Sequence, residues 1–557
     1  MELLERARQW AGHDPDPATA SALSADIEAA QRGDEEAAAR VGAAMNGPLQ
    51  FGTAGLRGTV GPGESRMNLA VVIRATAGLC EVVKRHATGT PTLVVGCDAR
   101  YGSSEFAAAA CRVASAAGVR VLALPQANPT PLTAFSMLHF DADAGVMVTA
   151  SHNPAPDNGY KVYLGGTVAQ GDGRGVQIVP PFDVEIAAAI EAAPPADEVP
   201  MNDDLVEAVD PREEYVACAS ALASGEASAR EDLRIVLTAM HGVGAAITSR
   251  VLAEAGFSNV SLVEAQADPD PDFPTVPFPN PEEAGALDMA MEQAREQGAD
   301  LIIAVDPDAD RCALAVPDPT LEKGWSPLSG DQIGSLLGEV LASRGMRGSL
   351  ANSIVSSRLL SRIAHAHGLE HHTTLTGFKW IARAPGLGFG YEEAIGFCPD
   401  PAHVRDKDGI ATSVVAASLV AALKAQGRSV WDELERLARL HGLHVSSPLT
   451  FRVEEIEQIA NGMARLRAQP PSVLAGSPVV EVSDLSQGYR GLPPTDGVLV
   501  LTEAGDRVIA RPSGTEPKLK CYLEVILPVT EGEPLPWDQA RERLDAIKGA
   551  FAEIIGL

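Results

Sequence analysis

The 557-residue sequence lacks the cysteine patterns that mark disulfide frameworks or zinc sites. Its seven cysteines are scattered and include no C-x-x-C pair, so we expect reduced, mostly buried thiols. The N-terminus mixes both charges and has no apolar signal-peptide region, and the longest weakly polar stretch, 410–423, is too short to cross a bilayer. These absences predict a soluble, cytoplasmic protein with no membrane partner.

Basic residues are also scarce. Lysine and arginine number 44 against 74 aspartates and glutamates, which gives a formal net charge of −30. The negative electrostatic field of such a chain repels phosphate polymers and anionic lipids, so we expect no binding to nucleic acid or membrane surfaces. An anionic small molecule would need a locally basic site.

The composition is ordinary for a globular chain, with 45% hydrophobic and 21% charged residues. The length corresponds to about three or four domains. Stretches rich in Pro, Ala and Asp suggest where these domains meet. We therefore expect an N-terminal helical segment with a first α/β domain over 1–205, α/β domains over 206–320 and 321–445, and an α+β domain over 446–557.

The order of apolar runs predicts the fold class. The first fifty residues favour helices, without suggesting chemistry. Beyond them, β-branched runs at 92–100, 144–154, 235–242 and 301–311 alternate with helical patterns, which predicts mostly parallel α/β layers with ligands at the strand ends. Near the C-terminus, two apolar runs joined at Gly505-Asp506 predict a hairpin, and a further run and a helix from Trp537 complete an α+β domain.

The sharpest local motif is Asp306-Pro-Asp308-Ala-Asp310-Arg311, directly after the apolar run LIIAV. Three carboxylates at alternate positions can direct their oxygens at one hard cation, and Mg²⁺ is usual where phosphate completes the shell. An exposed acidic loop is the alternative, but the preceding strand and Arg311 favour a metal. The glycine and distal glutamate of a calcium EF-hand are absent.

A second motif, Thr149-Ala-Ser151-His152-Asn153-Pro154, also follows a predicted strand. A serine on a tight turn can act as a covalent nucleophile, while nearby backbone N–H groups hold phosphate oxygens. Helix capping by Ser151 is the alternative. His152 is not assigned as its base, because adjacent side chains usually diverge, and no G-x-S-x-G elbow supports a hydrolase triad.

A third motif, Arg511-Pro-Ser-Gly-Thr-Glu-Pro-Lys518-Leu-Lys520, places three cations and two hydroxyls around a glycine turn. These groups suit a phosphate dianion, although a solvated turn is the alternative. Near the start of the chain, Phe51-Gly-Thr-Ala-Gly-Leu-Arg57-Gly58 places one arginine in a flexible turn and is uninformative alone.

Together, FGTAGLRG, TASHNP, DPDADR, GYEEAIG and RPSGTEPK resemble the α-D-phosphohexomutase superfamily, and most closely its phosphoglucomutase branch. The resemblance covers about residues 50–530, with the motifs in the family's order. It implies three related α/β domains with mixed sheets, plus a C-terminal α+β domain, around a central cleft.

The resemblance also implies roles for the reacting centre. Ser151 would be the phosphorylated serine, and one Mg²⁺ per chain would bind a phosphoserine oxygen and the three aspartates, Asp306, Asp308 and Asp310. Arg311 would steady the transferring phosphoryl group, with Arg57 and Lys161 lining the same centre. Lys407 matches a proposed acid/base lysine, although a surface ion pair is an equal alternative.

Other positions would bind the sugar phosphate. Glu392 would accept hydrogen bonds from ring hydroxyls, while Ala394 stands where some phosphoglucomutases have a serine. The remaining substrate-binding candidates are His152, the sugar-orientation loop residues Thr376, Gly377 and Lys379, and the phosphate-clamp residues Arg511, Ser513, Gly514, Thr515 and Lys520.

These roles predict an isomerase that interconverts glucose 1-phosphate and glucose 6-phosphate. Phospho-Ser151 would give a glucose 1,6-bisphosphate that serves as intermediate and activator. The partners would be small sugar phosphates, and the chain would be a monomer or homodimer. Phosphomannomutase, phosphopentomutase (phosphodeoxyribomutase) and glucose 1,6-bisphosphate synthase activities remain open, and so does a non-catalytic sugar-phosphate sensor.

Overall fold

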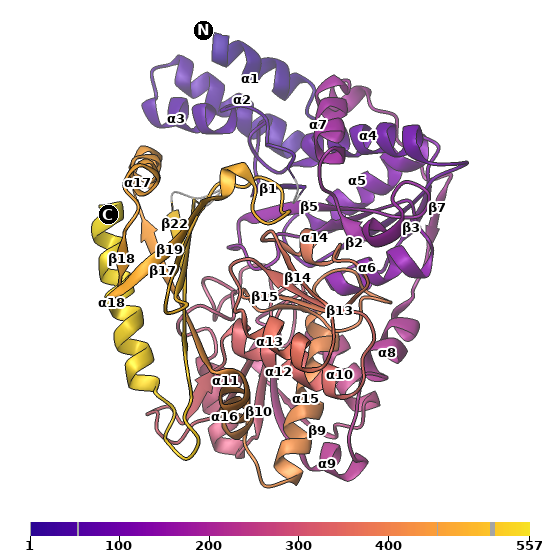
Figure 1. The fold of residues 1–557 in the computed structure, drawn as a ribbon. Helices are drawn as coiled ribbons and strands as arrows, with labels where there is room; N and C mark the ends of the chain where they lie inside the picture. Colours follow the sequence, from indigo (N-terminus) through magenta and orange to yellow (C-terminus); the bar gives the residue numbers. More distant parts are fainter. Residues whose placement is uncertain (1, 53–54, 454, 513–517, 557) are drawn as a thin grey trace. The chain divides into compact units, whose positions relative to one another are not determined.

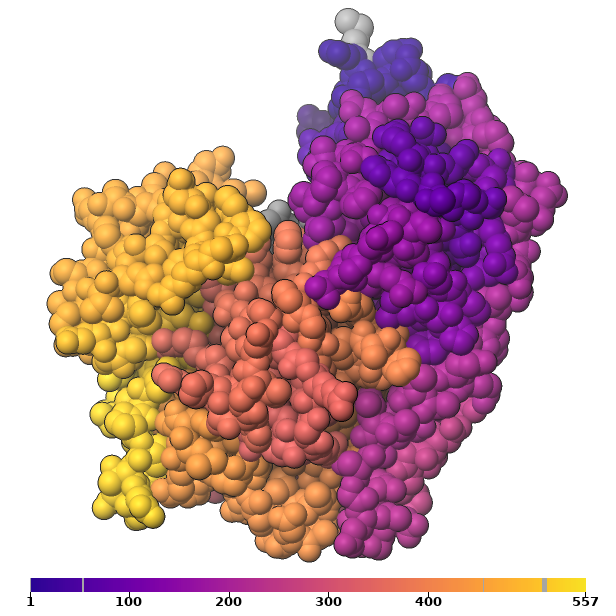
Figure 2. Space-filling model, turned by 45° about the vertical axis from the view of Figure 1, so that its right-hand side comes forward, coloured from indigo at the N-terminus to yellow at the C-terminus, as the bar shows by residue number. Residues whose placement is uncertain are grey.

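The computed structural model describes residues 2–52, 55–453, 455–512 and 518–556. It divides into two compact units, Met1–Leu328 with Gly396–Ala425, and Ser329–Ile395 with Gln426–Leu557. Three helices open the first unit, as the sequence predicts: α1 (Glu2–Gly12), α2 (Pro17–Gln31) and α3 (Glu35–Ala44). The carboxylates of Asp16 and Asp34 cap α2 and α3. In Figure 2 the indigo atoms of these helices continue into the purple surface of the first α/β domain.

The first sheet has the strand order β1-β5-β4-β2-β3-β7, with β6 beside β5. Strands β4, β2, β3 and β7 run parallel, whereas β5 returns antiparallel along β4 and β1 runs antiparallel along β5. This sheet is therefore mixed. Its strands are β1 (Leu56–Thr59), β2 (Thr92–Cys97), β3 (Arg120–Ala123), β4 (Ala144–Val148), β5 (Asp157–Leu164), β6 (Val176–Gln177) and β7 (Val206–Ala208). Its helices are α4 (Leu69–His86), α5 (Ser103–Ala116), α6 (Thr130–His139) and α7 (Phe182–Ala192).

The second sheet of this unit is also mixed, in the order β12-β11-β10-β8-β9. Its central strand β10 is buried along its whole length and runs parallel to β8, which confirms the strands expected at 301–311 and 235–242. Its strands are β8 (Arg234–Thr238), β9 (Asn259–Leu262), β10 (Leu301–Val305), β11 (Cys312–Pro317) and β12 (Trp325–Pro327). The other elements are α8 (Arg212–Ser220), α9 (Ala227–Asp232), α10 (Ala245–Glu254), α11 (Asp288–Gln297), β16 (Gly396–Cys398) and α15 (Gly409–Ala425).

The second unit begins with the parallel strands β14-β13-β15. Ser329 caps α12 with a capping box, in which its hydroxyl and the Gln332 side chain satisfy each other's backbone N–H groups. The elements are α12 (Gly330–Ser343), β13 (Ser349–Ser353), α13 (Leu359–Ala366), β14 (His371–Thr374), α14 (Phe378–Ile381), β15 (Leu387–Glu392) and α16 (Val430–His441).

The rest of this unit is a six-stranded antiparallel sheet, in the order β17-β22-β21-β20-β19-β18. Figure 1 draws this part of the chain in orange and yellow. The hairpin predicted at Gly505 joins β20 to β21, and the predicted C-terminal helix begins at Trp537, so both expectations are confirmed. The elements are β17 (Leu443–Arg452), α17 (Ile456–Ala468), β18 (Val473–Leu474), β19 (Ser477–Asp484), β20 (Val498–Thr502), β21 (Arg507–Pro512), β22 (Lys518–Leu527) and α18 (Trp537–Ile555).

Within the described residues, no single helix is long and apolar enough to span a membrane. Helices α15 and α16 together have the length and apolar composition of a membrane span, but the chain bends by 94° between them. Most residues of α15 are buried inside the first unit. All seven cysteines are free thiols, and only Cys218 is partly exposed.

Candidate active site

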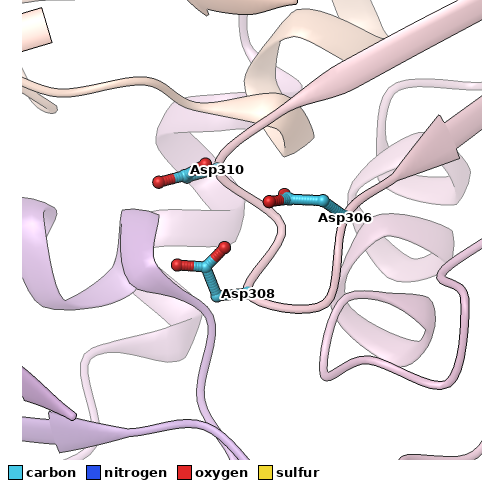
Figure 3. Close-up of side chains that lie close together, drawn as sticks. All are labelled: Asp306, Asp308 and Asp310. Atoms are coloured by element: carbon cyan, nitrogen blue, oxygen red, sulfur yellow. The ribbon is translucent and has the colours of Figure 1, made fainter. Parts of the chain in front are cut away.

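The loop after β10 brings three carboxylates together. Asp306, Asp308 and Asp310 are fully buried, and one oxygen of each lies within 4.8 Å of the others. Figure 3 shows the three side chains extending from this single loop into a shared space. Ala309 has φ of 56°, a left-handed conformation that turns the chain between the second and third aspartates. The alternative of an exposed acidic loop is wrong.

The free oxygens of this loop fit a divalent cation. Oδ1 of Asp308 and Oδ1 of Asp310 are buried and have no hydrogen-bond partner among the described residues. Buried carboxylate oxygens are normally paired, and oxygens of this type are the ligands that Mg²⁺ takes. The donor set therefore suits Mg²⁺.

Two lysines neutralise part of the carboxylate charge. Nζ of Lys161 lies 2.7 Å from Oδ2 of Asp308 and 2.9 Å from Oδ2 of Asp310. Nζ of Lys407 lies 3.1 Å from Oδ2 of Asp310. Although burial opposes ionisation, these ammonium groups hold the pKa values of Asp308 and Asp310 below their ordinary range. Burial and the two neighbouring carboxylates instead raise the pKa of Asp306 well above its usual value.

Ser151 lies at this acidic loop. Its side chain comes three residues after β4, and its Oγ donates a hydrogen bond of 2.9 Å to Oδ2 of Asp306. Ser151 has φ of 52° and is almost fully buried. In this part of the described chain the serine is followed by turns and then by β5, so it does not cap a helix. The helix-capping alternative is wrong.

The side chains of Ser151 and His152 converge, contrary to the expectation from their adjacent positions. Oγ of Ser151 lies 3.2 Å from Nδ1 of His152. Burial, assisted by the cations Arg311 and Arg57, lowers the pKa of His152 well below its usual value. The imidazole is therefore neutral near pH 7 and can accept or donate one hydrogen bond at this atom.

The structure brings the other predicted residues of the reacting centre into the same unit. The backbone N–H of Arg311 donates to Oδ1 of Asp306 at 2.9 Å, and its guanidinium lies 3.8 Å from Glu282. Arg57 is exposed and donates to Oδ1 of Asn153 at 3.1 Å. Arg57 thus contacts the loop that carries Ser151.

Lys407 is buried, so the surface ion-pair alternative is wrong. The preceding residue, Asp406, fixes its loop by accepting hydrogen bonds of 2.7 Å from the Tyr163 hydroxyl and from Nε2 of Gln177. The Tyr215 hydroxyl donates to Oδ1 of Asp408 at 2.8 Å. Hydrogen bonds to the residues before and after Lys407 therefore fix the position of its backbone.

The second unit contains the predicted sugar and phosphate contacts. Arg511 and Lys520 are directly opposite each other on β21 and β22, and the Arg511 guanidinium donates to Oγ1 of Thr376. Gly377 has φ of 103°, which a side chain would disfavour. Glu392 ends β15, and Lys379 lies in α14. The remaining clamp candidates, Ser513, Gly514 and Thr515, lie outside the described residues.

Sequence reasoning missed two residues that support this site. Oγ1 of Thr130 donates to Oδ2 of Asp308 at 2.6 Å, and the guanidinium of Arg100 donates to the backbone carbonyl of Ser151 at 2.7 Å. Arg100 is the last residue of the run predicted at 92–100, where polar residues gather at a ligand site. Thr130 begins α6 after β3, a strand that the sequence analysis did not predict, so the sequence offered no signal for it.

Comparison with known protein families identifies the fold. The four models of the phosphoglucomutase/phosphomannomutase family match in order: α/β/α domain I at 48–195, domain II at 213–320, domain III at 329–440 and the C-terminal domain at 451–526. The chain belongs to this family, within the α-D-phosphohexomutase superfamily. The family consists of phosphomutases, which are isomerases, and its four-domain α/β architecture is the one expected from the motifs.

Relatives within the family carry different substrate names. A "probable phosphomannomutase" of Haemophilus influenzae is 44% identical, covering 82% of this chain and 93% of its own. A phosphopentomutase of Homo sapiens is 31% identical over 99% of this chain and 95% of its own. A phosphoglucomutase of Staphylococcus haemolyticus is 34% identical over 86% and 90%.

Solved structures of family members share the fold. A phosphoglucomutase/phosphomannomutase family protein of Burkholderia thailandensis has a TM-score of 0.68 and 20% identity, covering 91% of this chain and 97% of its own. The open form of pp63/parafusin, a Paramecium phosphoglucomutase, has a TM-score of 0.70 and 18% identity, covering 91% and 96%.

Proposed function

We propose that this family member is a phosphoglucomutase that interconverts glucose 1-phosphate and glucose 6-phosphate. The observation that carries the proposal is the 2.9 Å contact between Oγ of Ser151 and Oδ2 of Asp306. In this contact the Ser151 hydroxyl lies beside a cluster of buried carboxylates that suits Mg²⁺, which supports its role as the nucleophile. A phosphoryl carrier next to a cation is the arrangement that a phosphoserine mutase needs.

Ser151 would donate its phosphoryl group to the free hydroxyl of the sugar phosphate. The P–O bond to Oγ breaks, a P–O bond to the sugar oxygen forms, and the hydroxyl proton passes to a base, for which we propose the neutral amine form of Lys407. The resulting glucose 1,6-bisphosphate returns its other phosphoryl group to Oγ of Ser151. The proton then returns to the released sugar oxygen, so the cycle balances.

The surrounding side chains would stabilise the charge that moves during transfer. Mg²⁺ held by Asp306, Asp308 and Asp310 would withdraw charge from the phosphoryl oxygens when bound. Lys161 and Arg311, both beside the aspartate loop, would offset further negative charge, and Arg57 would act from the serine loop. The neutral imidazole of His152 would contact the phosphoryl group or substrate.

The second unit would recognise the rest of the substrate. Glu392 would accept hydrogen bonds from the ring hydroxyls, and Thr376, Gly377 and Lys379 would read the sugar orientation. Arg511 and Lys520, with Ser513, Gly514 and Thr515, would hold the phosphate that is not being transferred. A mutase must bind that phosphate on either carbon, and cations and hydroxyls can do so because they contact only the phosphate oxygens.

Two alternatives within the family have specific support. The Haemophilus influenzae relative favours a phosphomannomutase, and the Homo sapiens relative, which matches nearly the whole chain, favours a phosphopentomutase. A glucose 1,6-bisphosphate synthase would use the same serine with another phosphoryl donor. A sugar-phosphate sensor would need neither the nucleophile nor the aspartates.

The test is a substrate panel with purified protein free of host mutase. With Mg²⁺ and a trace of glucose 1,6-bisphosphate, we expect glucose 1-phosphate to give a higher kcat/KM than mannose, ribose or deoxyribose 1-phosphate. A higher kcat/KM with another sugar phosphate would identify that sugar phosphate as the substrate and would contradict the proposal of glucose. Turnover that requires an added acyl phosphate would identify a synthase, and binding without turnover of any sugar phosphate would identify a sensor.

A further inference from the structure

One buried arginine binds the whole serine loop. The guanidinium of Arg100 donates hydrogen bonds to four backbone carbonyls, three in the loop that carries Ser151 and one at the start of β5. Because a guanidinium is planar and its donors form a rigid fork, it fixes the relative positions of the carbonyls it binds. The four bonds are Nη2 to Ser151 O (2.7 Å) and to Asn153 O (2.6 Å), and Nη1 to Pro154 O (2.9 Å) and to Asp157 O (3.1 Å).

The Arg100 side chain is itself held in place. Its Nε lies 3.5 Å from Oδ2 of Asp98, and its guanidinium carbon lies 4.9 Å from the centre of the Phe273 ring. Oδ1 of Asp98 accepts hydrogen bonds from the backbone N–H of Arg100 at 3.0 Å and from Oγ of Ser103 at 2.6 Å. The carboxylate and the aromatic ring therefore confine the guanidinium to one orientation.

The loop needs such support because of the backbone at Ser151. A φ of 52° is left-handed, a conformation that residues with a side chain rarely adopt without help. The bond from Arg100 fixes the carbonyl of this residue, while the Ser151 N–H donates to Oγ1 of Thr149 at 2.9 Å. Rotation out of the left-handed region would move Oγ away from Oδ2 of Asp306.

We propose that Arg100 is a positioning residue for phosphoryl transfer, because its guanidinium holds the Ser151 loop in the conformation that aims Oγ at the aspartate loop. Arg100 acts through the backbone and does not touch the reacting atoms in this structure. The inference rests on the proposed function, in which Ser151 carries the phosphoryl group.

The same domain offers a matched control. Nη2 of Arg74 donates to three backbone carbonyls, those of Ile190 (3.1 Å), Glu191 (3.3 Å) and Ala193 (3.3 Å), at the C-terminal end of α7. Arg74 therefore makes the same kind of contact with a different segment. Its loss removes comparable hydrogen bonds without touching the Ser151 loop.

The experiment compares Arg100→Gln, Arg100→Lys and Arg74→Gln in the full-length protein. We expect Arg100→Gln to lower kcat by about 100-fold, the effect of a small misplacement of a reacting group, with KM for the sugar phosphate little changed. Arg100→Lys should lie between wild type and Arg100→Gln, because one ammonium cannot bind four carbonyls. Arg74→Gln should keep near wild-type kcat.

A second readout follows the transfer step directly. Mass spectrometry after rapid mixing with glucose 1,6-bisphosphate measures how fast Ser151 gains a phosphate. This rate should fall in Arg100→Gln together with kcat and should stay unchanged in Arg74→Gln. A merely structural role would lower the melting temperature in both arginine variants without slowing phosphorylation.

Folded Arg100→Gln with wild-type kcat and phosphorylation rate would overturn the proposal, and so would an equal loss of kcat in Arg74→Gln. If Arg100→Gln does not fold, Arg100→Lys decides by the same measures. Ser151→Ala separates the two levels of inference. Turnover in Ser151→Ala rejects the proposed function, whereas an inactive Ser151→Ala beside a fully active Arg100→Gln rejects only the role of Arg100.

Discussion

The ammonium nitrogen of Lys161 lies 2.7 Å from Oδ2 of Asp308, while Oδ1 of the same carboxylate has no partner among the described residues. One oxygen is thus neutralised by the chain itself, and the other is left for a cation. The lysine supplies charge compensation that a buried carboxylate requires, but it also repels any divalent ion that binds beside it.

Lys161→Gln should therefore separate metal binding from catalysis. We expect Mg²⁺ to bind more tightly, on the order of tenfold or about 1.4 kcal/mol, because a neighbouring positive charge is lost. We expect kcat to fall, because that charge would offset the transferring phosphoryl group. Calorimetric titration with Mg²⁺ measures the first effect, and Lys161→Arg is the charge-preserving control. Weaker Mg²⁺ binding in Lys161→Gln would contradict this account.

Ser151→Ala should remove the phosphoryl carrier. Mutase turnover should fall at least about 1,000-fold, while binding of glucose 1-phosphate, measured by calorimetry, should persist. Ser104→Ala is a matched control in the same domain, since that exposed hydroxyl donates its hydrogen bond to the neighbouring Glu105. Wild-type turnover in Ser151→Ala, in protein cleared of host mutase, would reject the assignment.

Asp308→Asn should weaken the metal site without unfolding the domain. The amide can still accept a hydrogen bond from Thr130, but it no longer offers a charged oxygen to Mg²⁺. The Mg²⁺ concentration for half-maximal activity should rise about 10- to 100-fold. Glu322→Gln, an exposed change of equal charge, controls for the loss of one negative charge. An unchanged Mg²⁺ requirement would exclude Asp308 as a ligand.

Asp408 should make the stability of the first unit depend on pH. Burial raises the pKa of its carboxyl from 3.8 to about 7, against the hydrogen bonds from the Ala411 N–H and the Tyr215 hydroxyl that favour the ionised form. The folded state therefore binds the proton more tightly than the unfolded state. Its stabilising contribution is present below about pH 4 and is lost as the pH rises to about 7, by about 4 kcal/mol at most.

Asp408→Asn removes this titration. The difference in free energy of unfolding between Asp408→Asn and wild type, from urea denaturation, should shift in favour of the variant between about pH 4 and 7 and then level off. Asp141→Asn, the same change at an exposed position, is the matched control. A difference that stays constant across this range would contradict the assignment of the raised pKa to Asp408.

Local patterns in the sequence predicted much of the fold and the acidic loop. The run LIIAV and its alternating aspartates predicted both β10 and the buried cluster, because strand and motif are contiguous. The turn at Gly505 predicted the hairpin for the same reason. β5 was missed, because nearly every residue of Asp157–Leu164 is buried and no alternation of apolar and polar residues marks it.

Contacts between distant segments could not be predicted in this way. Lys407 reaches Asp310 across 97 positions of the sequence, and nothing local to either residue indicates the pairing. Arg100 shows the same limit, since its partners begin 51 residues further along the chain and are backbone carbonyls, which every sequence contains. The family resemblance located Lys407 but offered no role for Arg100.

The register of β21 and β22 sets Arg511 directly opposite Lys520. Two positive charges on neighbouring strands repel each other, so this part of the sheet is less stable when alone than the same strands with neutral side chains. A phosphate dianion bound between them would remove that repulsion. By linkage, the ligand that the sheet is proposed to hold would also strengthen the sheet, and the protein would resist unfolding most when it is occupied by its substrate.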